Sequence, residues 1–492
     1  MYKVSIRRKD LNSFLTSKRQ KLARPREVGS KAPSLDEVHF VLKHTRSKEG
    51  LVKAGPAINC ALSILGSSSE FFIAAKDLGF TEFIMGMMGE LDPIRDSEII
   101  ELIFHFATNS ISEGVCLEEL VSVEFLKVVA NILKVNSHPL VLSQIAWLSR
   151  NVMIEWSILK KDKLVLSNEL LKFLFTKLES ATHQAFDRQG IPSQLSEAMM
   201  SFYLVASIEN YIFCISPELI RLTFRIVSDK EAEGFEDALE LLRRLRVAPL
   251  VDFFDREIVT SGAHKSIMLS VNDPSEYIRN EATSSIVYIV ESTTPELKEN
   301  LFGMLDLVKD LFPVVVKNLR AVSLDLVFHS LLLIDHLLSR EDIYSSLTWN
   351  PVVDFEPLFK FLHSNNPEIV NRTLELLDTF STNVDPARCL DYLVSNRNFI
   401  EYLIGSINKP QPKDNLELLL KIVVNFIYVC NELENVGQAE FNYVARYIES
   451  DSDLSKMLAD GVFAALEKYN TEDLIFQKCV VLQEELPFVD WH

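Results

Sequence analysis

The chain has 492 residues, with 50 Lys and Arg against 69 Asp and Glu, and its formal net charge is −19. A hydrophobic content of 48% is that of a folded, globular body, whereas only 15 glycines argue against glycine-rich phosphate loops. An acidic chain repels the phosphates of nucleic acids, so we expect no direct nucleic-acid binding and look instead for a basic partner.

The first 31 residues reverse the sign of the charge. They hold ten basic side chains against two acidic ones, a net charge of +8, which leaves −27 for the other 461 residues. The basic residues fall into three clusters: Arg7, Arg8 and Lys9; Lys18, Arg19 and Lys21; Arg24 and Arg26. No apolar stretch follows them, so we expect this segment not to act as a secretory signal. The segment is either a solvated arm or a binding segment, and Gly and Pro in the linker between residues 29 and 34 would let it move.

From about residue 34 onward the apolar residues recur at helical spacing. DSEIIELIFHFATNSI (96–111) and HPLVLSQIAWLSRNVM (138–153) both place them at i, i+3, i+4 and i+7. Helix starts are marked by a polar residue and Pro before an acidic first turn, as in SNNPE (364–368). No apolar run approaches the ~18 residues of a membrane helix, so we expect no membrane insertion.

These helices repeat along the chain. Asn109 and Asn151 occupy equivalent places 42 residues apart, Asp335 and Asp378 do so 43 apart, and Asn425 follows 47 later. Ser207 and Tyr288 fill the positions between them if THQAFDRQGIPSQ (182–194) is an insertion. A period of about 40–47 residues is typical of armadillo and HEAT repeats. The predicted fold is all-α, a right-handed superhelical armadillo solenoid: a basic, mostly flexible arm (1–31), a linker and first helix (32–49), and about ten repeats (50–490).

Two segments resemble the importin-alpha (karyopherin-alpha) family. Residues 425–482 are similar to its last two repeats, with Tyr447, Ile448 and Glu449 in pattern and Tyr469 in place of a family His. RRKDLNSFLTSKRQKLARPREV (7–28) resembles its importin-beta-binding segment, although it is shorter and less basic. The resemblance implies a nuclear import adaptor that shuttles between cytoplasm and nucleus. Its groove would bind Lys/Arg-rich nuclear localisation signals. Its arm would bind importin-beta or fold back into the groove, and its C-terminal repeat would meet an export factor.

The family's inner helices present Trp-x-x-x-Asn, which places both side chains on one helical face. The Asn amide can hold a peptide backbone, the indole can take a Lys or Arg stem, and an acidic residue one turn later can capture an ammonium group. Trp147, Asn151 and Glu155 match this set, so the resemblance assigns them to the major site. The alternative is that Trp147 packs between helices and Asn151 ends one.

The neighbouring repeats depart from this pattern. His105 with Asn109, and Tyr203 with Ser207, stand where the family has Trp and Asn in the major site. A possible minor site is reduced to Asp335 and Asp378, because Leu331 and Leu374 replace its two tryptophans. Since Asp cannot donate a hydrogen bond as Asn does, binding of a bipartite signal is in doubt.

We expect no enzyme, cofactor or metal site. The sequence has no GxSxG, P-loop or HExxH motif, and its six cysteines form no CxxC pair, which is typical of reduced thiols in a cytosolic or nuclear protein. Two alternatives to the import adaptor stay open. One is an armadillo scaffold unrelated to transport, and the other is a dedicated chaperone for one basic client protein.

Overall fold

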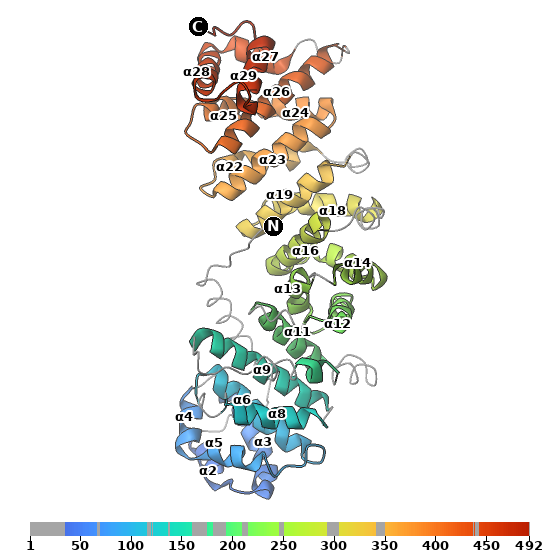
Figure 1. The fold of residues 1–492 in the computed structure, drawn as a ribbon, viewed down its shortest axis with the longest axis vertical. Coiled ribbons are helices and arrows are strands. Elements are labelled where there is room, and N and C mark those ends of the chain that lie inside the picture. Colours follow the sequence, from blue (N-terminus) through green and yellow to red (C-terminus); the bar gives the residue numbers. More distant parts are fainter. Residues whose placement is uncertain are drawn as a thin grey trace. The chain divides into compact units, whose positions relative to one another are not determined.

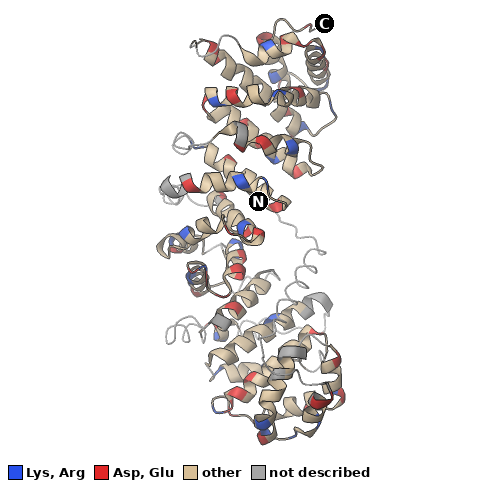
Figure 2. Cartoon of the chain, turned by 180° about the vertical axis from the view of Figure 1, so that it is seen from behind, with Lys and Arg blue, Asp and Glu red and all other residues tan. Residues whose placement is uncertain are grey.

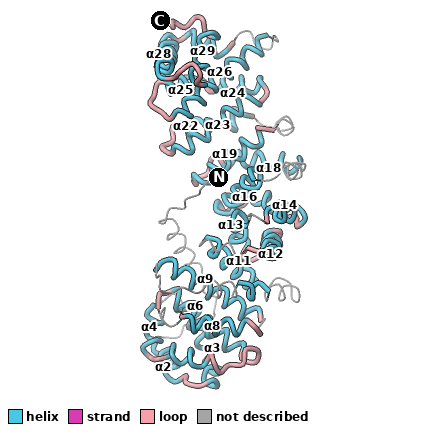
Figure 3. Tube along the Cα trace, viewed as in Figure 1, coloured by secondary structure: helices cyan, strands magenta, loops and turns pink. Residues whose placement is uncertain are grey.

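The computed structural model describes a set of ranges separated by short gaps: 35–65, 69–115, 120, 122–135, 138–159, 175–180, 193–208, 215–245, 250–292, 305–340, 350–435, 437 and 442–491. Within these ranges every regular element is a helix, and Figure 3 shows helices joined by loops with no strand. The chain forms two compact units, residues 1–263 and 264–492, which are described in turn. The basic arm predicted for residues 1–31 lies outside the described ranges.

The first unit contains a series of helices in which each packs on the next: α3 to α6, α6 to α9, α9 to α11 and α11 to α13. Shorter helices pack against this series and complete its repeats (Figure 1). The helices are α2 (Leu35–His44), α3 (Lys48–Leu65), α4 (Ser69–Asp77), α5 (Phe80–Met87), α6 (Ser97–Ser112), α8 (Val123–Leu133), α9 (Pro139–Leu159), α11 (Ser193–Ile208), α12 (Pro217–Val227), α13 (Phe235–Leu245) and α14 (Val251–Thr260).

The second unit repeats this arrangement. Here α16 packs on α19, α19 on α23, α23 on α26 and α26 on α29, and the remaining helices flank them. The helices are α15 (Ala263–Ser270), α16 (Glu276–Ser292), α18 (Leu305–Asn318), α19 (Leu324–Leu338), α21 (Pro351–Asp354), α22 (Glu356–Leu362), α23 (Pro367–Asn383), α24 (Pro386–Ser395), α25 (Arg397–Ile407), α26 (Lys413–Asn435), α27 (Tyr443–Ser450), α28 (Ser452–Lys468) and α29 (Leu474–Glu485). The name "third helices" is used below for the ten helices of these two series, which are α3, α6, α9, α11 and α13 in the first unit and α16, α19, α23, α26 and α29 in the second.

Capping residues explain where many of these helices begin. Asn366 accepts a hydrogen bond from the Glu368 amide at the start of α23, and Pro367 follows it at the first helical position. Asp385 caps α24 in the same way, again with Pro in the next position. The side-chain oxygen satisfies an amide that has no partner inside the helix, and Pro has no amide to lose there. The polar-residue-plus-Pro signal in the sequence therefore marks real helix starts.

Hydrogen bonds join successive third helices at the repeat spacing. Asn383 of α23 donates to the Leu338 carbonyl at the end of α19, 45 residues earlier. His329 of α19 lies 3.0 Å from the Asn280 side-chain oxygen of α16, 49 residues earlier. The first separation lies within the period of about 40–47 residues expected from the sequence, and the second lies just above it. The all-α series of packed helices predicted from the sequence is confirmed.

Glycine is required where α13 begins. Gly234 has φ of +88°, and a Cβ added to it would lie 2.9 Å from backbone atoms of α11. A side chain there would meet both a left-handed backbone and a rigid neighbour. This close approach lets α13 lie directly on α11.

Candidate functional site

Seven positions singled out by spacing lie at equivalent places on the third helices. Each is 11 to 14 residues after the first residue of its helix, and the helices that carry them pack in series within each unit. The seven are Asn109, Asn151, Ser207, Tyr288, Asp335, Asp378 and Asn425. What differs among them is how far each side chain is exposed.

Asn151 is a buried structural residue in this arrangement. Its side chain is 3% exposed, and its amide nitrogen donates to the Thr108 carbonyl of α6 at 3.0 Å. Its amide oxygen accepts a hydrogen bond of 2.8 Å from the Arg150 guanidinium. Both ends of the amide are therefore used inside the protein, and Asn151 fastens α9 to α6. The expectation that it holds a peptide backbone does not fit this placement.

Trp147 lies on α9 one turn before Asn151, and its side chain is half-buried. The guanidinium of Arg150, itself only 1% exposed, lies 5.4 Å from the centre of the indole ring. A cation at this distance is attracted by the ring quadrupole. The indole therefore already contacts an arginine of its own helix, and Trp147 keeps part of its surface exposed. Glu155 belongs to α9, but its side chain lies outside the described residues.

The other major-site residues divide between surface and core. His105 and Asn109 are half-buried on α6, where the Asn109 amide donates to the His105 carbonyl at 3.1 Å. Ser207 is half-buried and donates to the Leu204 carbonyl. Tyr203 has no exposed surface and packs against Phe175 and Phe202. We expected Tyr203 to offer an aromatic face to a ligand. It does not, because the middle of α11 is buried on nearly all sides.

In the second unit the two leucines at the predicted minor site are core residues. Leu331 is 0% and Leu374 2% exposed. Asp335 is partly buried beside them, and burial raises the pKa of its carboxyl group above the usual range, although a hydrogen bond from Thr379 acts in the opposite direction. This half of the surface offers no aromatic slot at those positions.

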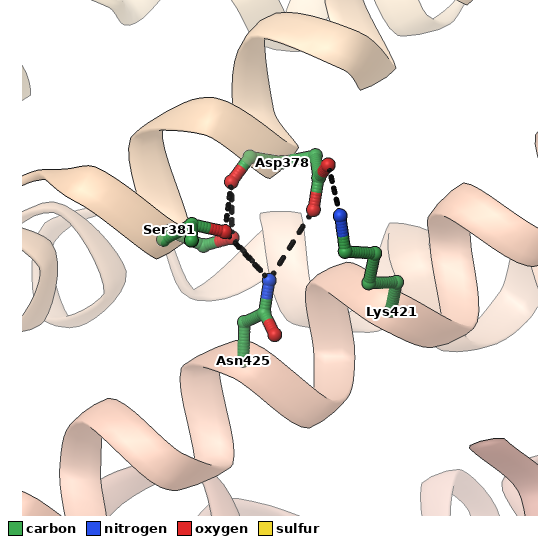
Figure 4. A network of polar contacts seen from close by, with 5 residues as sticks. Asp378, Ser381, Lys421 and Asn425 are labelled. Atoms are coloured by element: carbon green, nitrogen blue, oxygen red, sulfur yellow. Dashed lines mark hydrogen bonds and ion pairs between the residues drawn. The ribbon is translucent and has the colours of Figure 1, made fainter. Parts of the chain in front are cut away.

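Asp378 already holds a cation from its own chain. The Lys421 ammonium of α26 lies 2.6 Å from one carboxylate oxygen, and the Asn425 amide nitrogen lies 3.3 Å from the other (Figure 4). The carboxylate of Asp378, which was assigned to a possible minor site, is therefore already paired with a lysine of the same chain. Sequence reasoning missed Lys421, although it stands 43 residues after Asp378, one repeat along.

A cleft of about 760 Å³ opens beside this network. One wall is the stretch that ends α23 and begins α24, and the other is a stripe of α26. Tyr428 on the α26 wall is 42% exposed. The pKa of its phenol is raised, first by burial and then by the nearby carboxylates of Glu485 and Glu484. The lining residues are Ser381, Thr382, Asn383, Val384, Asp385, Pro386, Arg388, Asn425, Tyr428, Val429 and Glu432.

The acidic charge is concentrated in the second unit. Residues 264–492 hold 18 Lys and Arg against 35 Asp and Glu, whereas residues 32–263 hold 22 against 32. Figure 2 shows the two signs interspersed along the described helices. The described residues contain no group of three His, Cys, Asp or Glu arranged to hold a metal ion. Nor does any helix among them combine the length and apolar character needed to cross a membrane.

No protein-family model matches the chain. No curated protein matches it either. Solved structures do match. An engineered protein of a structural genomics consortium has a TM-score of 0.55 at 13% identity, over 92% of this chain and 98% of its own. A chain from work on the phosphorylation switch that controls the interaction between cadherin and beta-catenin has a TM-score of 0.59 at 12% identity, over 99% of this chain and 98% of its own. A designed armadillo repeat protein covers 54% of this chain, with a TM-score of 0.40.

The fold is an armadillo-repeat solenoid. The similarity extends over nearly the whole chain, while the identity is low, so it concerns the fold alone.

Proposed function

We propose that this armadillo chain is an adaptor that binds basic, extended segments of partner proteins. In its specific form it is a nuclear import adaptor that recognises Lys/Arg-rich localisation signals and shuttles between cytoplasm and nucleus. The proposal includes neither catalysis nor a cofactor.

One observation carries this proposal: the chain's own cations already make both contacts that a basic ligand would need. Arg150 lies over the Trp147 indole at 5.4 Å, and Lys421 is held by the Asp378 carboxylate at 2.6 Å. Both contacts lie on third helices. The excess of carboxylates over basic groups leaves further acceptors for cations supplied by a partner. The solved structure from the cadherin and beta-catenin work concerns an interaction between proteins, which agrees with a binding role for this fold.

A specific observation keeps the second candidate open. Leu331 and Leu374 are buried where an import adaptor of the resembling family has exposed tryptophans. A scaffold, or a dedicated chaperone for one basic client, needs no such pair of sites. If this candidate is correct, a folded basic protein should bind more tightly than any short signal peptide.

The first test uses a fluorescein-labelled PKKKRKV peptide and the full chain in a fluorescence anisotropy titration. Trp147→Ala should weaken binding by about 2- to 30-fold, which corresponds to the ~0.5–2 kcal/mol of a cation–π contact. Trp491→Ala is the matched control, because Trp491 is also half-buried and its ring nitrogen donates a hydrogen bond to the Leu486 carbonyl of the second unit. Equal affinity of the Trp147→Ala and control variants would remove Trp147 from the site.

The second test concerns the basic arm, which lies outside the described residues. Residues 1–34 fused to a reporter should retain importin-beta from solution at low salt. The fusion with Lys18, Arg19 and Lys21 replaced by Ala should not, because the contact would be electrostatic. If the unmodified fusion retains no importin-beta, the scaffold or chaperone candidate replaces the import adaptor. The repeat at about 445–490, which comprises α27 to α29, is the proposed contact for an export factor.

A further inference from the structure

We infer that the cleft between the end of α23 and α26 is a binding pocket for an arginine side chain of a partner segment. This inference rests on the proposed function only in that the ligand is basic. The pocket is separate from the predicted major-site residues, and its residues Tyr428 and Glu432 belong to none of the sequence-predicted sites.

The network beside the cleft fixes the orientation of the Asn425 amide. Ser381 and Thr382 each donate their hydroxyl hydrogen to the Asp378 carbonyl, at 2.9 and 2.8 Å. Their oxygens can therefore only accept from Asn425, and both lie 3.1 Å from its amide nitrogen. The Asp378 carboxylate, paired with Lys421, also accepts. Three acceptors on one side require that the nitrogen of Asn425 faces them.

The amide oxygen of Asn425 consequently faces away from the network, as Figure 4 shows. It accepts no hydrogen bond from the residues that the structure describes. Since Asn425 also lines the cleft, this oxygen is an oriented acceptor for a ligand. The orientation is maintained by an ion pair that spans two repeats, so it needs no ligand to form.

The remaining acceptors of this wall share one face of α26. Tyr428 lies three residues after Asn425, and Glu432 lies four residues after Tyr428, so the three side chains form one stripe about two turns long. Tyr428 is 42% exposed, and Glu432 is exposed. The stripe thus combines an amide oxygen, an aromatic face with a phenol, and a carboxylate.

The opposite wall sets where a ligand cation can lie. Arg388 of α24 is half-buried there, and the Asp385 carboxylate is bonded to the Ala387 and Arg388 backbone amides at 2.9 and 3.3 Å. This wall therefore carries one positive and one negative side chain, and its carboxylate already accepts hydrogen bonds from the start of α24. A positive group gains most on the α26 wall, where Glu484 and Glu485 add their field to that of Glu432.

Arginine fits this wall better than lysine. Its guanidinium has five donors in a plane, so it can bond to an amide oxygen and a carboxylate while it stacks on a tyrosine ring. A lysine ammonium is a compact point charge. It cannot stack on the tyrosine ring and bond to two separated acceptors at the same time, so it should bind this wall less tightly. The pocket should therefore distinguish the two basic residues.

The test measures binding of three fluorescein-labelled peptides, (Arg-Ser)5, (Lys-Ser)5 and (Glu-Ser)5, to the full chain at low salt. We expect (Arg-Ser)5 to bind at least threefold more tightly than (Lys-Ser)5, and (Glu-Ser)5 not to bind. Glu432→Gln and Tyr428→Leu should each weaken (Arg-Ser)5 binding by about 2- to 5-fold.

Glu434→Gln is the matched control, because it removes the same charge from an exposed residue of α26 that does not line the cleft. The inference is overturned if Glu432→Gln and Glu434→Gln have equal effects, or if lysine and arginine peptides bind equally. A chain whose (Arg-Ser)5 binding responds to Trp147→Ala but to no cleft variant would retain the proposed function and lose the pocket. If neither basic peptide binds, both are wrong.

Discussion

Replacing Asn151 with Ala tests whether this side chain holds two repeats together or faces a ligand. The change removes the hydrogen bond to the Thr108 carbonyl, 3.0 Å long, and an acceptor 2.8 Å from the Arg150 guanidinium. Both groups are buried, and each buried group that loses its partner costs about 1–3 kcal/mol. We expect the first unit to lose about 3 kcal/mol of unfolding free energy, a shift of about 1 M in the urea midpoint for a slope of about 2–3 kcal/mol per M.

The assay is urea unfolding followed by circular dichroism, with hydrogen exchange to locate the loss in α6 and α9. Asn109→Ala is the control at the equivalent position, because the Asn109 amide donates only within its own helix, to the His105 carbonyl. It should cost less than about 1 kcal/mol. If Asn151→Ala costs no more than Asn109→Ala but weakens PKKKRKV binding, Asn151 faces the ligand and the burial argument is wrong.

Three further predictions concern other parts of the chain. Gly234→Ala should destabilise the first unit by about 2 kcal/mol or more, whereas Gly262→Ala, with φ of +76° but open space at its Cβ, should cost only about 1 kcal/mol in urea unfolding. Asp335→Asn should stabilise the second unit at pH 7. A carboxyl whose pKa is raised on folding binds its proton more tightly in the folded state, so its ionisation lowers stability as pH rises. The gain over the native chain should therefore shrink in urea titrations as pH falls from 7 toward the ordinary Asp pKa of about 4. Lys421→Met should cost the second unit about 1 kcal/mol, and adding Asp378→Asn should recover most of it, since the carboxylate left unpaired is then gone; a double-mutant cycle that shows no coupling would contradict this.

The repeat architecture could be predicted from the sequence because the residue patterns that indicate it are local. Apolar residues at helical spacing and a polar cap before Pro367 act within one or two turns, so they are present whatever the neighbouring repeats do. The period then follows from counting. This is why the fold class was predicted correctly although no curated protein matches the chain.

The site could be read only in part, because exposure depends on how repeats pack. Asn151 and Asn109 share a register position, yet only Asn151 finds an acceptor on the preceding helix and is buried. Nothing within α9 distinguishes the two cases. The same holds for Asp378, whose partner Lys421 lies 43 residues later and carries no motif. Knowledge of which helix faces pair is needed before such residues can be assigned to a ligand.

The hydrogen bonds that link third helices also bear on how the chain acquires its structure during synthesis. Asn151 to Thr108, Asn383 to Leu338 and Lys421 to Asp378 span 43 to 45 residues, about one repeat. Each contact can therefore form once the next repeat has left the ribosome, without waiting for the C-terminus. Short loop closures of this kind favour rapid, stepwise folding from the N-terminal end, and they let a lesion in one repeat be felt mainly by its two neighbours.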